Sequence, residues 1–246
     1  MSRIEETFIK ENFTDVKLTL TNLWMYQVRK NLFKAIINQS KEFKGRLLDV
    51  GCGVMPYKQT LINSKHITSY VGLDLEQTNY YEDVKPDVTW DGIVMPFENK
   101  SFDTIMATEV LEHSYEPEKL LNEIYRVLKP GGVFFCTVPF IWHLHETPHD
   151  EYRYTPFSLE KKLKGAGFEK IEIRALGGWD SALSQLLGLW VTYRPMRGFM
   201  KRIMLRVAKF SIRYLDKNDV APRVFDTKEN SMISGLSAIC YKKGDG

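Results

Sequence analysis

The sequence is poor in cysteine, has no long hydrophobic run and carries almost balanced charge. Its three cysteines, Cys52, Cys136 and Cys240, are widely spaced in apolar segments. This pattern is typical of buried free thiols rather than a disulfide framework or a zinc site, so we expect a reducing, cytoplasmic environment. Residues 1–15 are charged and lack the apolar centre of a signal peptide, and no run reaches the roughly 18 apolar residues of a spanning helix. We therefore expect a protein that is neither secreted by that route nor membrane-spanning.

The net charge of +3 is too small to indicate a nucleic acid partner, and none is expected. With 246 residues, 43% of them hydrophobic, the chain can bury a substantial core as one domain. We find no internal repeat and no low-complexity linker. The function must therefore be sought in local patterns.

Apolar strand candidates alternate with helical patterns from residue 45 onward. Strands are expected at 46–50, 70–74, 102–107, 133–138, 169–175 and 236–242. Helices are expected at about 56–63, 116–128 and 156–166, and residues 1–44 also have helical spacing. This alternation predicts an α/β fold with a mostly parallel sheet, in which the loops that follow the strands line one ligand-binding edge.

The chain is organised around a strand, Leu47-Leu48-Asp49-Val50, that runs directly into the turn Gly51-Cys52-Gly53. Glycine lets the backbone approach a ligand closely because it has no Cβ, and between a strand and a helix such a turn cradles a nucleotide. Asp74 ends the second strand about twenty residues later, where a carboxylate accepts hydrogen bonds from ribose hydroxyls. The turn and the acid predict a nucleoside ligand, but they do not separate a nicotinamide dinucleotide from S-adenosylmethionine.

Pro56 and a series of later motifs separate these two ligands. A dinucleotide site needs a third glycine, so that pyrophosphate can rest on the helix N-terminus, whereas here the turn leads to Pro56. The later motifs are Trp90-Asp91-Gly92-Ile93-Val94-Met95-Pro96-Phe97, Ser101-Phe102-Asp103, Thr108-Glu109-Val110-Leu111-Glu112-His113 and Arg126-Val127-Leu128-Lys129-Pro130-Gly131-Gly132. Over about residues 45–175 this succession resembles the class I S-adenosylmethionine-dependent methyltransferases, in particular the type 11 subgroup.

The resemblance implies a Rossmann-like, seven-stranded, mostly parallel sheet with helices on both faces and an antiparallel last strand beside the fifth. It also implies S-adenosylmethionine as cofactor, S-adenosylhomocysteine as product, and this set of cofactor-binding residues: Asp49, Gly51, Cys52, Gly53, Asp74, Leu75, Asp91, Gly92, Thr108 and Glu109. The glycine turn would hold the methionine part, Asp74 the ribose and Asp91 the adenine amino group. The plainer interpretations are a solvated strand-end acid at Asp74 and an ordinary turn aspartate at Asp91.

The loop Pro139–Thr155 after the fifth strand is expected to bind the methyl acceptor. We predict four catalytic residues there: His145, His149, Asp150 and Arg153. His145 or His149 would be the base, because a neutral histidine can remove a hydroxyl proton near neutral pH. Asp150 would orient it and Arg153 would bind the substrate; alternatively, these two form an ion pair that only fixes the loop. The pattern from His145 to Thr155 is similar to one associated with bacterial type 11 enzymes of surface-glycan or small-molecule pathways.

Glu109, Glu112, His113 and Glu116 have residue types that can hold a metal ion. Some RNA-terminal methyltransferases use a similar Glu-x-x-Glu-His-x-x-His arrangement to hold a divalent ion. Here Glu116 replaces the final histidine, and Leu-Glu-His is common in type 11 enzymes without metal. No metal ligand is therefore predicted.

Residues 177–233 separate two strand candidates and read as a helical insertion. A nearly uncharged stretch, 179–193, precedes a basic stripe made of Arg202, Arg206, Lys209, Arg213 and Lys217. An apolar stripe, Ile203, Val207, Phe210 and Tyr214, lies beside it. Residues 195–217 could thus contact an anionic membrane surface, which would place the protein peripherally at the inner membrane face. The alternative is that the apolar stripe packs on the domain or, through 177–233, on a second subunit.

We expect one methyltransferase domain over 1–246: a helical N-terminal lid (1–44), a cofactor-binding core (45–176), the helical insertion (177–233), and the final strand and tail (234–246). The predicted reaction is O-methylation of a hydroxyl on a small molecule or a glycan or lipid-linked intermediate by in-line methyl transfer. The alternatives are a nicotinamide-dependent oxidoreductase and a non-catalytic, cofactor-binding or membrane-associated adaptor.

Overall fold

The computed structural model describes residues 7–76, 85–222, 225 and 231–244, and the chain divides into two compact units. The first comprises 1–36, 139–144 and 174–236, and the second comprises 37–138, 145–173 and 237–246. The expectation that both units belong to one domain stays a prediction. No described helix combines the length and the apolar character needed to cross a membrane.

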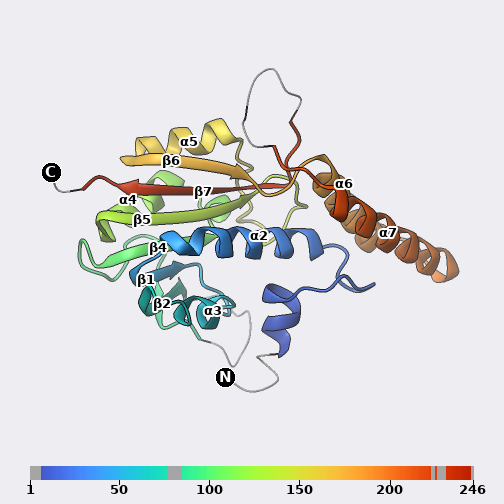
Figure 1. Ribbon diagram of the computed structural model, residues 1–246, viewed down its shortest axis with the longest axis horizontal. Helices are drawn as coiled ribbons and strands as arrows, with labels where there is room; N and C mark the ends of the chain where they lie inside the picture. The colour runs from blue at the N-terminus through green and yellow to red at the C-terminus, as the bar shows by residue number, and fades with distance from the viewer. Residues whose placement is uncertain (1–6, 77–84, 223–224, 226–230, 245–246) are drawn as a thin grey trace. The chain divides into compact units, whose positions relative to one another are not determined.

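The second unit holds nearly all of a seven-stranded sheet with the order β3-β2-β1-β4-β5-β7-β6 (Figure 1). The strands are β1 (Gly45–Val50), β2 (Ile67–Leu75), β3 (Val88–Trp90), β4 (Phe102–Thr108), β5 (Leu128–Pro139), β6 (Phe168–Ala175) and β7 (Gly235–Lys242). The pairs β1–β2, β1–β4, β2–β3 and β4–β5 are parallel, whereas β7 enters antiparallel between β5 and β6. The predicted fold class and the place of the last strand are confirmed.

The apolar runs form these strands because their side chains are buried on both faces of the sheet. Leu47 through Val50 and Val133 through Val138 are all buried, as expected for a parallel sheet that helices cover. The second unit contains α3 (Lys58–Ile62), α4 (Pro117–Val127) and α5 (Pro156–Gly165). Both α4 and α5 begin with proline at the first turn, and Thr155 and Ser158 form a reciprocal capping box on α5.

The first unit is built on three helices: most of α2 (Tyr26–Gln39), α6 (Trp179–Tyr193) and α7 (Gly198–Asn218). The helices α6 and α7 pack side by side (Figure 1). Their core consists of Leu23, Tyr26, Val191, Ala208 and Ile212. Asp219 caps α6 by accepting the backbone N–H groups of Gly178 and Ser181 at 3.0 and 2.9 Å. The predicted helical insertion before the last strand is therefore present.

Some sequence expectations differ from the structure in detail. Among the described residues up to 44, the helical ones are 7–9, which lead into a π-helical turn η1 (Lys10–Thr14), then α2 and a 3₁₀ turn η2 (Ser40–Glu42). Residues 15–25 form no regular helix, because Asn22 hydrogen-bonds to Thr19 and Lys17 and so closes a turn there. The strand β3 was not predicted, because it is short and none of its three residues is buried.

Candidate functional site

The glycine turn adopts positive φ angles, which residues with a side chain rarely adopt. Gly51 and Gly53 have φ of +65° and +49°, and a Cβ on Gly51 would lie 2.5 Å from Val110 Cγ2. Nothing lies within 4 Å of the corresponding position on Gly53. The backbone is therefore packed behind the turn at Gly51 and open at Gly53, which is the arrangement that close approach of a ligand needs. Cys52 between them is buried, and burial raises the pKa of its thiol above the usual range.

Asp49, the fifth residue of β1, is buried beside this turn. Its Oδ2 accepts a hydrogen bond from the Tyr70 hydroxyl on β2, whereas its buried Oδ1 has no hydrogen bond. Burial raises the pKa of Asp49 to about 7, although the Tyr70 hydrogen bond acts in the opposite direction. An unsatisfied buried carboxylate oxygen beside an open glycine turn fits a ligand that brings its own positive or donor group.

Asp74, near the end of β2, holds the turn in place. Its Oδ2 accepts the Gly53 N–H at 2.7 Å and its Oδ1 accepts the Leu75 N–H at 2.8 Å. Each carboxylate oxygen has further acceptor capacity, so ribose hydroxyls can still be bound. The structure therefore places Asp74 against the glycine turn, as the predicted nucleoside site requires, and leaves Leu75 partly exposed next to it.

Asp91 and Gly92 follow β3 in an exposed turn. Asp91 Oδ1 accepts the N–H groups of Ile93 and Val94 at 2.8 and 3.3 Å, and these bonds lower the pKa of Asp91. This is the geometry of an ordinary turn aspartate, so the adenine role of Asp91 stays a prediction. Gly92 has φ of +81°, and a Cβ there would meet Leu75 Cδ2 at 3.2 Å, which links this turn to the end of β2.

Thr108 and Glu109 lie where β4 ends. Glu109 has φ of +55°, a strained value for a residue with a side chain, and its N–H donates to Thr137 O at 3.1 Å. Because β1 and β4 are adjacent parallel strands, this edge is shared by Asp49, Gly51 and Glu109. The structure brings the predicted methionine-side residues to one sheet edge, while their contacts with the cofactor remain predictions.

The acceptor loop is organised by Asp150. Its carboxylate accepts two hydrogen bonds from Arg153 at 2.6 and 2.8 Å, and His145 Nδ1 lies 3.2 Å from Asp150 Oδ2. Arg153 holds the pKa of Asp150 well below its usual range. Asp150 is therefore ion-paired with Arg153 and also lies within hydrogen-bond distance of His145, while the catalytic roles of these residues stay predictions. His149 is exposed, and it contributes its backbone carbonyl, which accepts from His113 Nδ1 at 2.9 Å.

Glu112 is a buried carboxylate whose setting the sequence did not reveal. It lies in the 3₁₀ turn η3 (Leu111–His113), its side chain is fully buried, and neither carboxylate oxygen is hydrogen-bonded. Burial, followed by the charge of Glu109, raises the pKa of Glu112 well above its usual range. Glu112, His113 and His145 each bring one ligand-type atom within 4.8 Å of the others. Of the weighed metal residues, Glu116 instead pairs with Lys119 at 2.7 Å.

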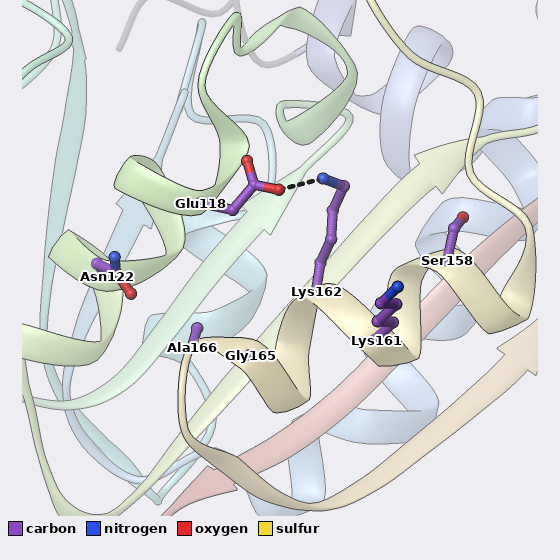
Figure 2. A pocket seen from close by; sticks show the side chains of 7 residues that line it. All are labelled: Glu118, Asn122, Ser158, Lys161, Lys162, Gly165 and Ala166. Atoms are coloured by element: carbon purple, nitrogen blue, oxygen red, sulfur yellow. Dashed lines mark hydrogen bonds and ion pairs between the residues drawn. The ribbon is translucent and has the colours of Figure 1, made fainter.

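The hollows in the described parts of the chain include one in each unit. One, of about 470 Å³, lies between α4 and α5, and Figure 2 shows the Glu118–Lys162 ion pair across it. No predicted site residue lines it, and its polar groups are largely exposed.

The other hollow, of about 550 Å³, belongs to the first unit and is lined mainly by aromatic and aliphatic side chains. His143 and Tyr193 line it, with ring centroids 4.8 Å apart. Trp142 lines it as well, and its ring lies 5.9 Å from that of Trp24. His143 comes two residues before His145 in the same loop, so the sequence had drawn attention to this segment without revealing its apolar surroundings.

The sheet order defines a Rossmann-like fold, and the glycine turn has the geometry expected for the predicted nucleoside ligand. Residues 48–136 match the type 11 methyltransferase family, described as "Methyltransferase domain". The match confirms the predicted resemblance to S-adenosylmethionine-dependent methyltransferases over this stretch of the chain. The geometry fits that cofactor, because Gly53 is open, Asp49 Oδ1 is unsatisfied and Asp74 stands against the turn.

The chain is also similar to curated sterol 24-C-methyltransferases. It is 31% identical to the protein of Debaryomyces hansenii over 150 residues, which covers 50% of this chain and 40% of that protein. It is 25% identical to the erg6 protein of Schizosaccharomyces pombe over 240 residues, or 80% of this chain and 60% of that one. The chain thus spans about half the length of the curated relatives it matches.

Solved structures show the same fold at low identity. The phosphoethanolamine N-methyltransferase 2 of Haemonchus contortus, in complex with S-adenosyl-L-methionine, has a TM-score of 0.52 and 17% identity, covering 96% of this chain and 60% of that one. An S-adenosylmethionine-dependent methyltransferase from Archaeoglobus fulgidus has a TM-score of 0.54 and 18% identity, covering 96% and 99%. At these identities the likeness shows the fold alone.

Proposed function

We propose that this chain is an S-adenosylmethionine-dependent methyltransferase that methylates a hydroxyl oxygen on a small molecule or a glycan or lipid-linked intermediate. The observation that carries the oxygen assignment is the His145–Asp150 pair, with 3.2 Å between Nδ1 and Oδ2. A carboxylate on Nδ1 fixes the tautomer in which Nε2 carries the lone pair. That nitrogen is suited to take a proton from a hydroxyl.

The reaction is an in-line displacement on the methyl carbon. The acceptor oxygen forms the new carbon–oxygen bond while the carbon–sulfur bond of the sulfonium breaks, so neutral S-adenosylhomocysteine leaves. The hydroxyl proton passes to His145, and Asp150 stabilises the resulting imidazolium. Burial, followed by the nearby His113, lowers the pKa of His145, which keeps the imidazole neutral and ready to accept the proton.

The aromatic hollow of the first unit supports an acceptor with an apolar part. Trp142, Leu186 and Trp190 offer it a large apolar surface, and His143 and Arg194 add a few polar groups. Such a lining is typical of sites for small organic ligands. A ligand with a hydrophobic portion fits this hollow.

The relatives support a second candidate, C-methylation of a sterol. Proteins named sterol 24-C-methyltransferase match the chain at 25–33% identity over parts of its length. In such a reaction a carbon atom of the acceptor attacks the methyl group, so no hydroxyl needs to be deprotonated before attack. The apolar hollow would suit a sterol as well as a lipid-linked hydroxyl compound.

We also propose that α7 contacts an anionic membrane surface. Val207, Phe210 and Tyr214 are 52%, 75% and 65% exposed, so this apolar stripe does not pack inside its own unit. Arg206 and Arg213 are exposed on the same helix. Apolar side chains flanked by basic ones suit the interface of an anionic bilayer. The buried face of α7 is instead formed by Ala208 and Ile212, and a second copy of the chain is the competing occupant of the exposed face.

Methyl transfer is tested with purified protein and isotopically labelled S-adenosylmethionine. The acceptor panel contains hydroxylated small molecules, polyprenyl-linked sugars and sterols, and mass spectrometry with NMR identifies the methylated atom. A labelled methyl ether supports O-methylation, and a new carbon–carbon bond on a sterol supports the second candidate. Cofactor binding without product across the panel would favour a non-catalytic adaptor, and tighter binding of NAD than of S-adenosylhomocysteine would favour an oxidoreductase.

A further inference from the structure

Glu112, His113 and His145 form a compact cluster in the second unit. The first two lie in η3 and the third lies in the acceptor loop, and their ligand atoms lie within 4.8 Å of one another. His113 Nε2 is 3.8 Å from Glu112 Oε1, and the two imidazole centroids are 4.6 Å apart at an angle of 69°. One carboxylate and two imidazoles are a common donor set for a divalent transition metal.

The Glu112 carboxylate independently points to a missing cation. Its side chain has no exposed surface, and neither oxygen has a hydrogen bond. Burying a carboxylate without a donor is costly, and buried charges in proteins are paired or bound to metal. A metal ion at this position would satisfy the carboxylate.

Both histidines are held in the way that metal-binding histidines usually are. His113 Nδ1 lies 2.9 Å from the carbonyl oxygen of His149, and His145 Nδ1 lies 3.2 Å from Asp150 Oδ2. Donation from each Nδ1–H to these oxygens leaves the lone pair on Nε2, and partners of this kind orient the ring and raise its basicity. Asp150 is fixed in turn by the two hydrogen bonds from Arg153.

The backbone also holds the two halves of the cluster together. The N–H groups of Glu151 and Tyr152 donate to the carbonyl of Glu112 at 2.9 and 3.2 Å. The buried Tyr154 hydroxyl donates to the Leu111 carbonyl at 3.0 Å. The loop that carries His145 is therefore attached to η3, so little rearrangement is needed to bring the three ligands around one ion.

We propose that Glu112, His113 and His145 bind one divalent transition metal ion of the Zn²⁺ or Mn²⁺ type, through the carboxylate and the two Nε2 atoms. Imidazole nitrogens suit Zn²⁺, and Mn²⁺ suits the carboxylate, whereas Mg²⁺ and Ca²⁺ are bound almost entirely through oxygen. Tetrahedral bonds of about 2.1 Å would set the ligand atoms about 3.4 Å apart, and His113 Nε2 already lies 3.8 Å from Glu112 Oε1. Three protein ligands leave a position open for an oxygen from water or substrate.

The metal also gives the acceptor hydroxyl a route to activation, a consequence that rests on the proposed function. A hydroxyl bound at the open position would lose its proton more easily because the metal stabilises the alkoxide. In the metal-bound form the proton would pass to solvent, and His145 would act as a ligand in place of the base role proposed above, because its Nε2 lone pair cannot bind the ion and accept the proton at the same time.

Metal binding is measured on the full chain after treatment with a chelator, without cofactor or acceptor. Titration calorimetry with ZnCl₂, MnCl₂ and MgCl₂ is combined with metal analysis of the dialysed protein. We expect one Zn²⁺ or Mn²⁺ per chain and much weaker binding of Mg²⁺. His113→Ala, His145→Ala and Glu112→Gln should each weaken binding about a hundredfold or more, and Asp150→Asn about 10- to 100-fold, as for other residues that orient a ligand.

His66→Ala is the matched control, because His66 is an exposed histidine outside the cluster. Circular dichroism of each metal-free variant shows whether it is folded, and His145→Ala, at a partly exposed side chain, keeps the test valid if Glu112→Gln unfolds. The proposal is overturned if the wild type takes up neither Zn²⁺ nor Mn²⁺, or if His66→Ala weakens binding as much as the cluster variants. Methyl transfer by a chelator-treated, metal-free enzyme would leave the proposed function standing, whereas metal uptake without methyl transfer would overturn only that function.

Discussion

Tyr70 donates its hydroxyl hydrogen to Asp49 Oδ2 across adjacent strands, and this leaves Oδ1 as the unsatisfied side of a fully buried carboxylate. The two residues belong to β2 and β1, directly behind the glycine turn. Burial raises the pKa of Asp49 to about 7 in spite of this hydrogen bond. With a pKa near neutrality, Asp49 would be ionised more readily when a positively charged ligand lies beside it.

The first prediction concerns the pH dependence of stability without cofactor. Because the pKa of Asp49 is raised from 3.8 to about 7, the folded state binds the proton more tightly than the unfolded state. The free energy of unfolding should therefore fall as the pH rises from about 4 to about 7, by up to about 4 kcal/mol from this group. Asp49→Asn, which keeps an acceptor for Tyr70, should remove this part of the dependence. Urea unfolding at a series of pH values measures the difference.

The same group should make cofactor binding depend on pH. S-adenosylmethionine carries positive charge, which favours ionised Asp49, so binding below about pH 7 should release a proton. Calorimetry in buffers of different ionisation enthalpy detects this release, and Asp49→Asn should abolish it. Identical proton release by wild type and variant would rule out Asp49 as the linked group.

The second prediction separates packing from ligand access in the glycine turn. Gly51→Ala combines left-handed strain with the Val110 clash, so it should lower the free energy of unfolding by about 2–5 kcal/mol. Gly53→Ala has no clash and should cost only about 1–2 kcal/mol, but its Cβ enters the open side of the turn and should weaken cofactor binding. Chemical unfolding and calorimetry measure the two effects.

Gly131→Ala is the control for this comparison. Gly131 in β5 has φ of +69° and nothing within 4 Å of a Cβ, so the substitution carries the same strain outside the turn. It should match Gly53→Ala in stability and leave cofactor affinity unchanged. If Gly53→Ala binds cofactor as tightly as Gly131→Ala, the ligand does not approach the turn at Gly53.

The third prediction ranks the two candidate histidines. His145→Ala removes the imidazole that Asp150 orients, and turnover on the true acceptor should fall about 10²- to 10⁴-fold, as for loss of a general base. His149→Ala keeps the backbone carbonyl that accepts from His113, so the loss should be much smaller. Steady-state kinetics measures the loss of turnover in each variant. An unchanged cofactor affinity shows that the variant is folded. A larger loss for His149→Ala would transfer the role to that residue.

Much of the fold was predictable because strands of a parallel sheet are buried on both faces and appear in a sequence as runs of apolar residues. The buried runs around Leu48 and Phe134 and the turn at Gly51 have no other simple interpretation. The strand β3 could not be found in this way, since Val88–Trp90 is too short and too exposed for periodicity to show. The turn at Asn22 also depends on side-chain hydrogen bonds that compete with a helix.

The site was predictable in its parts but not in its connections. Asp74 and Gly53 were each expected near the ligand, yet their 2.7 Å hydrogen bond joins residues 21 positions apart. Glu112 and His145 come from different segments, so the spacing within Glu109 to Glu116, from which no metal ligand was predicted, could not reveal that His145 lies near Glu112. Helical spacing likewise described α7 correctly, while only the structure shows that Phe210 and Tyr214 lie on its exposed face.

The last prediction tests the membrane surface proposed for α7. Each basic residue near an anionic bilayer contributes about 1 kcal/mol, so changing Arg206, Lys209 and Arg213 together to Glu should lower vesicle affinity about a hundredfold or more. Flotation with phosphatidylserine-containing vesicles at low salt measures this. Changing the exposed Lys41, Lys65 and Lys161 to Glu alters net charge equally outside α7 and should have little effect.

Phe210→Ser should weaken the binding that remains at high salt, because the 75% exposed ring supplies apolar rather than ionic contact. If neither the wild type nor the variants float, and the wild type is instead a dimer that Phe210→Ser dissociates, the exposed face of α7 is a subunit interface.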